Sequence, residues 1–120
     1  MTDLVVVKLT WGAESPERVS QALTVAATVL AAGGTTSLWL TGDATLLATP
    51  GVLEDVSLPF AGSLADLRDA IVASGTLTVC SQCAARRGLT PTQLLPGVRL
   101  AGSAVFVEEI LTPGARSLVY

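Results

Sequence analysis

The stretch that decides the fold is residues 3–41, which read DLVVVKLTWGAESPERVSQALTVAATVLAAGGTTSLWLT. Its first seven residues form an apolar, β-branched run that is typical of a buried strand. Residues 15–17, Ser-Pro-Glu, predict a helix start with the serine as N-cap and an acid facing the helix dipole. Apolar residues then recur at helical spacing until the glycine pair at residues 33–34 ends the helix. Residues 36–41 form a second strand, so the stretch is a strand–helix–strand unit.

The same alternation continues through the rest of the chain. A short helical piece follows residue 42, an irregular connection covers residues 51–62, and a helix begins at Ser63 in a sequence that resembles a capping box. The remaining predicted elements are a strand at 76–79, a helix at 80–88, a helical turn at 90–95, a strand at 98–100, a helix at 102–111 and a strand at 117–120. This order predicts one α/β domain, residues 1–120, with about five mostly parallel strands and helices on both faces.

Charge is scarce in this chain. Half of the residues are apolar and 14% are charged, against roughly 25% in an average soluble domain. A domain of this size has much surface to cover, so we expect part of its apolar surface to be buried against other copies in a homo-oligomer. The net charge of −3 comes without clustered basic residues, which argues against nucleic acid as a partner.

Two further classes of protein are excluded by the pattern. Residues 19–42 carry no charge, but Gly33-Gly34 interrupts them, so a helix followed by a strand fits them better than a membrane span. The first residues are acidic and lead straight into a strand, which does not resemble a signal peptide. We therefore expect a cytoplasmic location and no membrane partner.

The chemistry of the chain depends on its two cysteines, because it has no histidine. The absence of histidine removes Ser-His-Asp and Cys-His catalysis and histidine metal sites. Cysteines three residues apart in a reducing compartment are more often reactive or metal-binding than structural. The sequence shows no fingerprint of a bound cofactor, and none is predicted.

Cys80 lies where a predicted strand runs directly into a helix. In a parallel sheet, ligands bind beyond the carboxyl ends of the strands, and the loops at 10–15, 42–45 and 80–83 reach that edge. A thiolate at a helix start is favoured by the free N–H groups and by the helix dipole, and Arg86 and Arg87 add positive potential. Cys83, one turn later, could resolve a mixed disulfide or a persulfide. Both cysteines are therefore candidate catalytic residues.

Other roles for the cysteines remain open. Free cysteines are among the most buried residues, so the pair could simply belong to the core. A Cys₄ zinc site would need two more ligands, which only a subunit interface could supply, and no metal site is predicted. A thioredoxin-type motif is a further alternative, although that fold carries its Cys-x-x-Cys after an early strand and this chain carries it after the third.

Several other residues are candidates for a supporting part in the site. Asp43 could line the site, but a helix N-cap role is preferred for it. Trp11 could stack on a ligand or pack, whereas packing is preferred for Trp39. Gly12, with Ser15, could bind an anion at the helix start. The adjacent glutamates 108 and 109 are expected on a solvated face or at the rim of an interface.

Three parts of the sequence resemble a known family. They are Val-Cys80-Ser-Gln-Cys83-Ala-Ala-Arg86-Arg-Gly88-Leu, the following Leu-x-x-Gly97-Val-x-Leu-Ala-Gly102, and the linker Leu-Glu54-Asp-Val-Ser-Leu-Pro. The chain thereby resembles the DsrE/DsrF/TusD-like sulfur-relay family over nearly its whole length, and the Cys-x₅-Arg-Arg-Gly spacing is the most specific part. The resemblance implies a flavodoxin-like sheet, assembly as homotrimers or homohexamers, and a persulfide on Cys80 that is exchanged with a sulfur-carrier protein partner. The second cysteine, Cys83, departs from the relay pattern of a single cysteine.

The sequence thus favours a sulfur-transfer protein, a possible sulfurtransferase, that carries a persulfide on Cys80. A dithiol redox protein that cycles Cys80 and Cys83 is the first alternative. A non-catalytic oligomeric binding module is the second.

Overall fold

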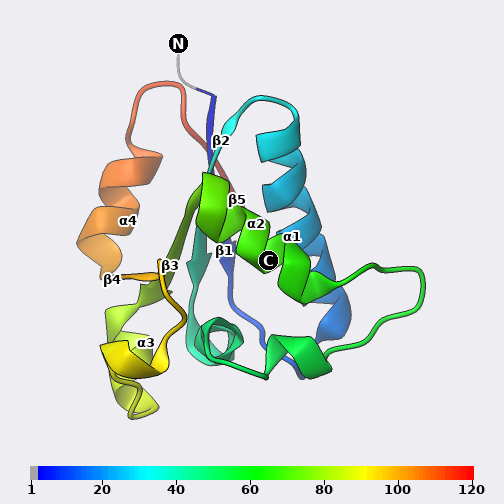
Figure 1. The fold of residues 1–120 in the computed structure, drawn as a ribbon. Coiled ribbons are helices and arrows are strands. Elements are labelled where there is room, and N and C mark those ends of the chain that lie inside the picture. The colour runs from blue at the N-terminus through cyan, green and yellow to red at the C-terminus, as the bar shows by residue number, and fades with distance from the viewer. Residues whose placement is uncertain (1–2) are drawn as a thin grey trace.

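The computed structural model describes residues 3–120. The chain has five strands that alternate with helices, and Figure 1 shows how these elements are arranged. The strands are β1 (Leu4–Leu9), β2 (Thr35–Leu40), β3 (Thr76–Cys80), β4 (Arg99–Ala101) and β5 (Arg116–Val119). The α-helices are α1 (Pro16–Ala31), α2 (Leu64–Ser74), α3 (Ser81–Arg86) and α4 (Ser103–Ile110), and three short 3₁₀ helices are η1 (Gly42–Ala48), η2 (Leu53–Asp55) and η3 (Pro91–Gln93).

All five strands lie parallel in one sheet, in the order β4-β3-β2-β1-β5. The chain adds strands in one direction from β1 to β4, and then returns to the other side of β1 with β5. This reversal sends the last crossover helix, α4, to the opposite face from α1 and α2, because each crossover is right-handed. The predicted α/β class, a flavodoxin-like parallel sheet with helices on both faces, is confirmed.

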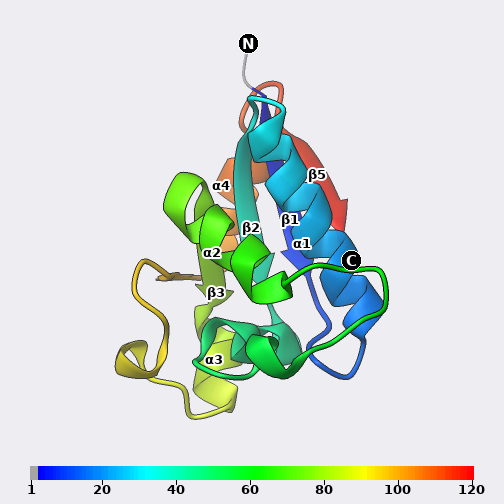
Figure 2. The ribbon, with the colours of Figure 1, turned by 45° about the vertical axis from the view of Figure 1, so that its right-hand side comes forward.

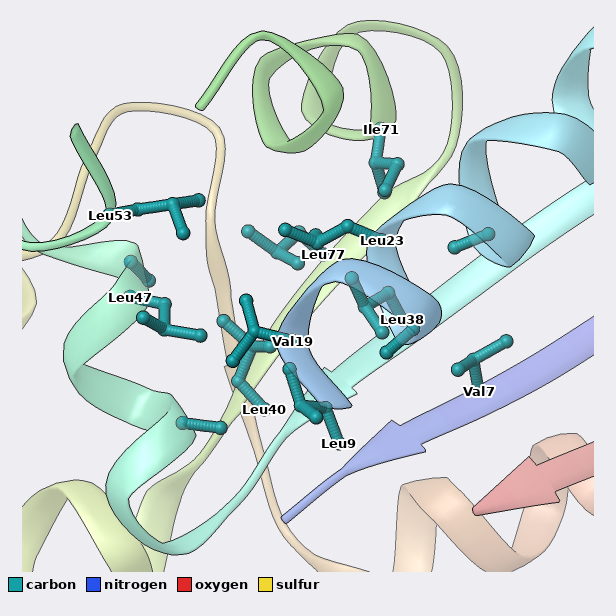
Figure 3. Close-up of a cluster of buried hydrophobic side chains, with 14 of the residues drawn as sticks. Val7, Leu9, Val19, Leu23, Leu38, Leu40, Leu47, Leu53, Ile71 and Leu77 are labelled. Carbon is teal, nitrogen blue, oxygen red and sulfur yellow. The ribbon is translucent and has the colours of Figure 1, made fainter. Parts of the chain in front are cut away.

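The main core lies between the sheet and the pair α1 and α2 (Figure 3). Alternate residues of the central strands, such as Val7, Leu38 and Leu77, point into it and are fully buried. Val19 and Leu23 of α1 meet them from the helix side. Alternate residues of the strands and one face of α1 therefore form a single apolar layer, as their spacing in the sequence predicts.

The other face of the sheet is covered by α4 alone among the described elements. In Figure 1 α4 lies on the opposite side of the strands from α1, and in Figure 2 it lies behind the strands while α1 lies in front. Along each strand, the residues that alternate with the core-facing ones point their side chains to this face, and most of them are polar. Strand pairing aligns Lys8 with Trp39, Trp39 with Thr78, and Thr78 with Arg99, so these four form one row across the sheet. The result is a polar layer under a single short helix.

The structure corrects two predicted helix caps. Ser15 occupies the N-cap position of α1, but its hydroxyl accepts a hydrogen bond from Arg18 and caps no backbone N–H. Asp43 is not an N-cap either: Thr41 takes that position, and Asp43 lies in the first turn of η1. Its carboxylate instead accepts two hydrogen bonds from the guanidinium of Arg87, the residue that follows α3. The predicted cap at Ser63 is confirmed, since its hydroxyl accepts from the N–H of Asp66.

The remaining differences are small. The connection predicted as irregular at 51–62 contains the single turn η2, and β3 extends one residue further than predicted, to Cys80. Within residues 3–120, no helix combines the length and apolar character that a membrane crossing requires.

Candidate functional site

Cys80 is the last residue of β3 and the residue that precedes α3. Its backbone is extended, with φ −61° and ψ 121°, so the helix begins at the next residue. Because it lies two residues after Thr78, its side chain points to the same polar face of the sheet. The thiol is free and half-buried. The structure thus places Cys80 at the carboxyl edge of a central strand, as predicted.

A small cavity of about 30 Å³ adjoins this cysteine. Its walls come from four separate elements and the loop after β2, and they mix polar and aromatic side chains. The lining residues are Lys8, Trp39, Thr41, Cys80, Ser103 and Phe106. Cys80 therefore does not belong to the apolar core, and it has a side on which a further atom can be placed.

Cys83 lies within α3, next to Cys80 and to the start of η1. Burial by itself would raise the pKa of the Cys83 thiol, but hydrogen bonds from the Gly42 backbone and the Cys80 thiol, together with the positive charges of Arg86 and Arg87, outweigh it and lower the pKa. The Arg86 guanidinium approaches the Cys83 sulfur at 3.9 Å. These groups favour the thiolate form of Cys83, whereas the sequence alone favoured the thiolate at Cys80 more strongly.

Arg87 connects α3 to η1 through hydrogen bonds. Its guanidinium donates two hydrogen bonds to one carboxylate oxygen of Asp43, at 3.0 and 2.7 Å, and a third to the Cys83 carbonyl at 3.1 Å. The backbone of Asp43 also packs against the loop that follows β1, because a Cβ on Gly12 would lie 2.6 Å from the Asp43 carbonyl oxygen. The three loops predicted to meet at the carboxyl edge are thus packed together there.

The two aromatic candidates have different surroundings. Trp11 is 40% exposed, and the guanidinium of Arg18 lies 4.3 Å from the centre of its ring. Trp39 is almost fully buried and packs edge-to-face on Phe106, with 5.4 Å between ring centres. The packing role predicted for Trp39 is confirmed, and its ring also lines the cavity beside Cys80.

Glu109 was predicted at a solvated face or an interface rim, and this prediction is wrong. Its carboxylate accepts hydrogen bonds from the Ser37 hydroxyl, from the Trp39 indole N–H at 2.9 Å and from Arg99 at 2.6 Å. Burial would raise the pKa of this carboxyl, but these donors outweigh it and lower the pKa. Glu109 therefore holds α4 on the sheet and fixes one wall of the cavity.

The alternation of side chains along the strands could have predicted the polar contacts around Glu109. Lys8, Ser37, Trp39, Thr78 and Arg99 occupy alternate positions of their strands and share one face. A polar face on a sheet needs a polar partner from the covering helix, and α4 offers Glu109.

Within the described part of the chain, no group of three or more cysteine, aspartate or glutamate side chains is arranged to hold a metal ion. The two cysteines lie next to each other but have basic neighbours, Arg86 and Arg87, rather than further acidic or thiol ligands.

Comparison with known proteins places the chain in a family. The family model of the DsrE/DsrF-like family matches residues 4–119. The chain belongs to this family. Membership indicates sulfur relay as the class of function, while it assigns no role to either cysteine of this chain. No curated protein matches the sequence.

The solved structures with a similar fold include two that match nearly the whole chain. The ychN protein from E. coli superposes with a TM-score of 0.79 at 19% identity, over 100% of both chains. MTH1491 from Methanobacterium thermoautotrophicum, described as a protein of unknown function, superposes with a TM-score of 0.63 at 15% identity, over 98% of both chains. At these identities the likeness establishes the fold of this DsrE/DsrF-like chain, and its chemistry must be argued from its own residues.

Proposed function

We propose that this DsrE/DsrF-like protein carries sulfane sulfur as a persulfide on Cys80. The Cys80 thiolate attacks the outer sulfur of a donor persulfide, a new sulfur–sulfur bond forms, and the donor leaves as a thiolate. A thiolate on a partner protein then attacks the outer sulfur in the same way and releases the Cys80 thiolate. Each step exchanges one sulfur–sulfur bond for another, so no external oxidant or reductant is required.

The observation that carries this proposal is the position of Cys80. It ends a central parallel strand at the carboxyl edge of the sheet, where such folds bind ligands, and it adjoins a cavity with polar walls. The basic side chains Arg86 and Arg87 follow in the chain, and their positive charges lower the pKa of the neighbouring Cys83 thiol. Sulfur relay as the function of the family supports the same role.

A specific observation favours a second candidate, a dithiol redox protein. The two thiols are neighbours, and Cys80 is among the groups that lower the pKa of Cys83. A Cys83 thiolate could attack a disulfide substrate, after which Cys80 would displace the mixed disulfide. The products would be a Cys80–Cys83 disulfide and two substrate thiols, so both electrons pass to the substrate.

Intact-mass spectrometry after incubation with inorganic tetrasulfide separates the two candidates. For a carrier, the wild type and Cys83→Ser gain the mass of one sulfur atom, and Cys80→Ser does not. For a dithiol protein, neither variant turns over, and the oxidised wild type is lighter by the mass of two hydrogens. Absence of any sulfur on the wild type and on Cys83→Ser contradicts the carrier proposal.

We also propose that the carrier is a homotrimer or homohexamer in the cytoplasm. Apolar side chains remain exposed on α4 and at its end, namely Val107 and Leu111, and on the edge strand β5, where Leu118 and Val119 point to opposite faces of the sheet. Exposed apolar side chains of this kind can be covered by a second copy of the chain. Light scattering at micromolar concentration should give three or six times the chain mass of 12.2 kDa. A monomer under these conditions contradicts the assembly.

A further inference from the structure

The cavity beside Cys80 is suited to very small contents. Its volume is about 30 Å³, whereas a cavity needs roughly 10–15 Å³ to hold one water molecule. It therefore has room for one or two atoms of water size. One outer sulfur atom attached to the Cys80 sulfur fits such a space.

Among the residues that line the cavity, Lys8 is the one with a charged side chain. This lysine stands in β1, which is otherwise apolar, and it is half-buried. Its ammonium lies 4.9 Å from the centre of the Phe106 ring, and within residues 3–120 no carboxylate lies within ion-pair distance of it. The acid on the covering helix, Glu109, is already bonded to Arg99, Ser37 and Trp39. A half-buried ammonium beside an aromatic ring favours an anion as its neighbour.

Hydroxyl groups complete the polar part of the wall. Ser103, the first residue of α4, can donate a hydrogen bond into the cavity that it lines. Thr41 also lines the cavity, but its hydroxyl donates to the Leu9 carbonyl at 3.3 Å. The donors available to a bound anion are therefore the Lys8 ammonium and the Ser103 hydroxyl.

We infer that this cavity is the binding site for the outer sulfur of the Cys80 persulfide, with Lys8 and Ser103 holding that sulfur as an anion. The inference rests on the proposed carrier function and assigns to Lys8 and Ser103 a role in it. When Cys80 takes the outer sulfur from a donor, the donor leaves as a thiolate, and the transferred sulfur loses its proton to solvent and retains the negative charge. Lys8 stabilises that charge until a partner thiolate removes the sulfur.

The test compares three variants in a Cys83→Ser background, so that Cys80 is the sole thiol. Lys8→Met removes the ammonium but keeps an unbranched side chain, and Ser103→Leu fills the cavity from the end of α4. Arg18→Met removes one positive charge that lies over Trp11, away from the cavity, and serves as the matched control. Each protein is treated with inorganic tetrasulfide, and intact mass gives the fraction and the half-life of the persulfide. Iodoacetamide labelling checks that Cys80 remains accessible.

Lys8→Met is expected to shorten the persulfide half-life about tenfold, because the anionic outer sulfur loses the opposite charge that favours it. Ser103→Leu is expected to take up little sulfur while its thiol is still labelled by iodoacetamide. Arg18→Met should behave as its parent. Parental uptake and half-life in either Lys8→Met or Ser103→Leu overturns the inference and leaves the carrier function intact. Absence of uptake in the Cys83→Ser parent itself overturns the carrier function, and the inference with it.

Discussion

Replacement of Glu109 by alanine should loosen the helix that covers the Cys80 cavity. The substitution removes the acceptor of the Trp39 indole N–H, and Trp39 is 2% exposed, so this donor becomes buried without a partner. Such a loss costs about 1–3 kcal/mol. Arg99 loses its ion pair as well, but at 38% exposure it can turn to water, which limits that cost to about 1 kcal/mol. We therefore expect a loss of about 2–4 kcal/mol in the free energy of unfolding.

Urea denaturation measures this loss as a lower midpoint with an unchanged slope. Glu108→Ala is the matched control, because Glu108 is the adjacent residue on α4 and is exposed; an exposed substitution of this kind changes stability by about 0.5 kcal/mol or less. The stabilisation by Glu109 also depends on pH. Since its pKa is lowered in the folded state, its contribution is present above the pKa of the unfolded chain and disappears as the pH falls through the folded value. Equal midpoints for Glu109→Ala and Glu108→Ala would refute the role of this network.

Two further predictions concern stability. Arg68 is fully buried, and its hydrogen bond lowers the pKa of Glu54 to about 2 from 4.5, so stability should fall as the pH drops through this interval. Because the Glu54 side chain is 45% exposed, the loss should be about 1–2 kcal/mol; Glu54→Gln should flatten the pH profile of the urea midpoint, and an unchanged profile would argue against the pair. Gly12→Ala places a Cβ 2.6 Å from the Asp43 carbonyl oxygen and should cost about 1–3 kcal/mol, whereas Gly62→Ala, with nothing within 4 Å, should unfold near the wild-type midpoint. Similar thermal midpoints for the two glycine variants would show that the loops can separate freely.

The fold was predictable because most of its determinants are local in the sequence. The apolar run at 4–9, the helical spacing in α1 and the glycine pair that ends it agree on one strand–helix–strand unit, and the structure has that unit. The position of Cys80 followed from the same reasoning, because a strand that runs directly into a helix must place the junction at the carboxyl edge of the sheet.

The polar partners were harder to predict, because they depend on which elements meet in space. Lys8 looked like an isolated charge in an apolar strand until the register placed it opposite Trp39. Glu109 could be assigned to a contact only once α4 was known to cover the polar face. Arg68 lies at helical spacing from Leu64 and Ile71, which are also buried. That spacing was a usable signal for its burial, although the identity of its partner, Glu54, was not available from the pattern.

The most direct test of the carrier proposal is a crystal structure of the protein after treatment with a sulfane-sulfur donor. The proposal predicts additional density for one sulfur atom, bonded to the sulfur of Cys80 and lying in the cavity that Lys8 and Ser103 line. Density for the added sulfur on Cys83 instead, or a bond between the sulfurs of Cys80 and Cys83 with the cavity unchanged, would contradict it.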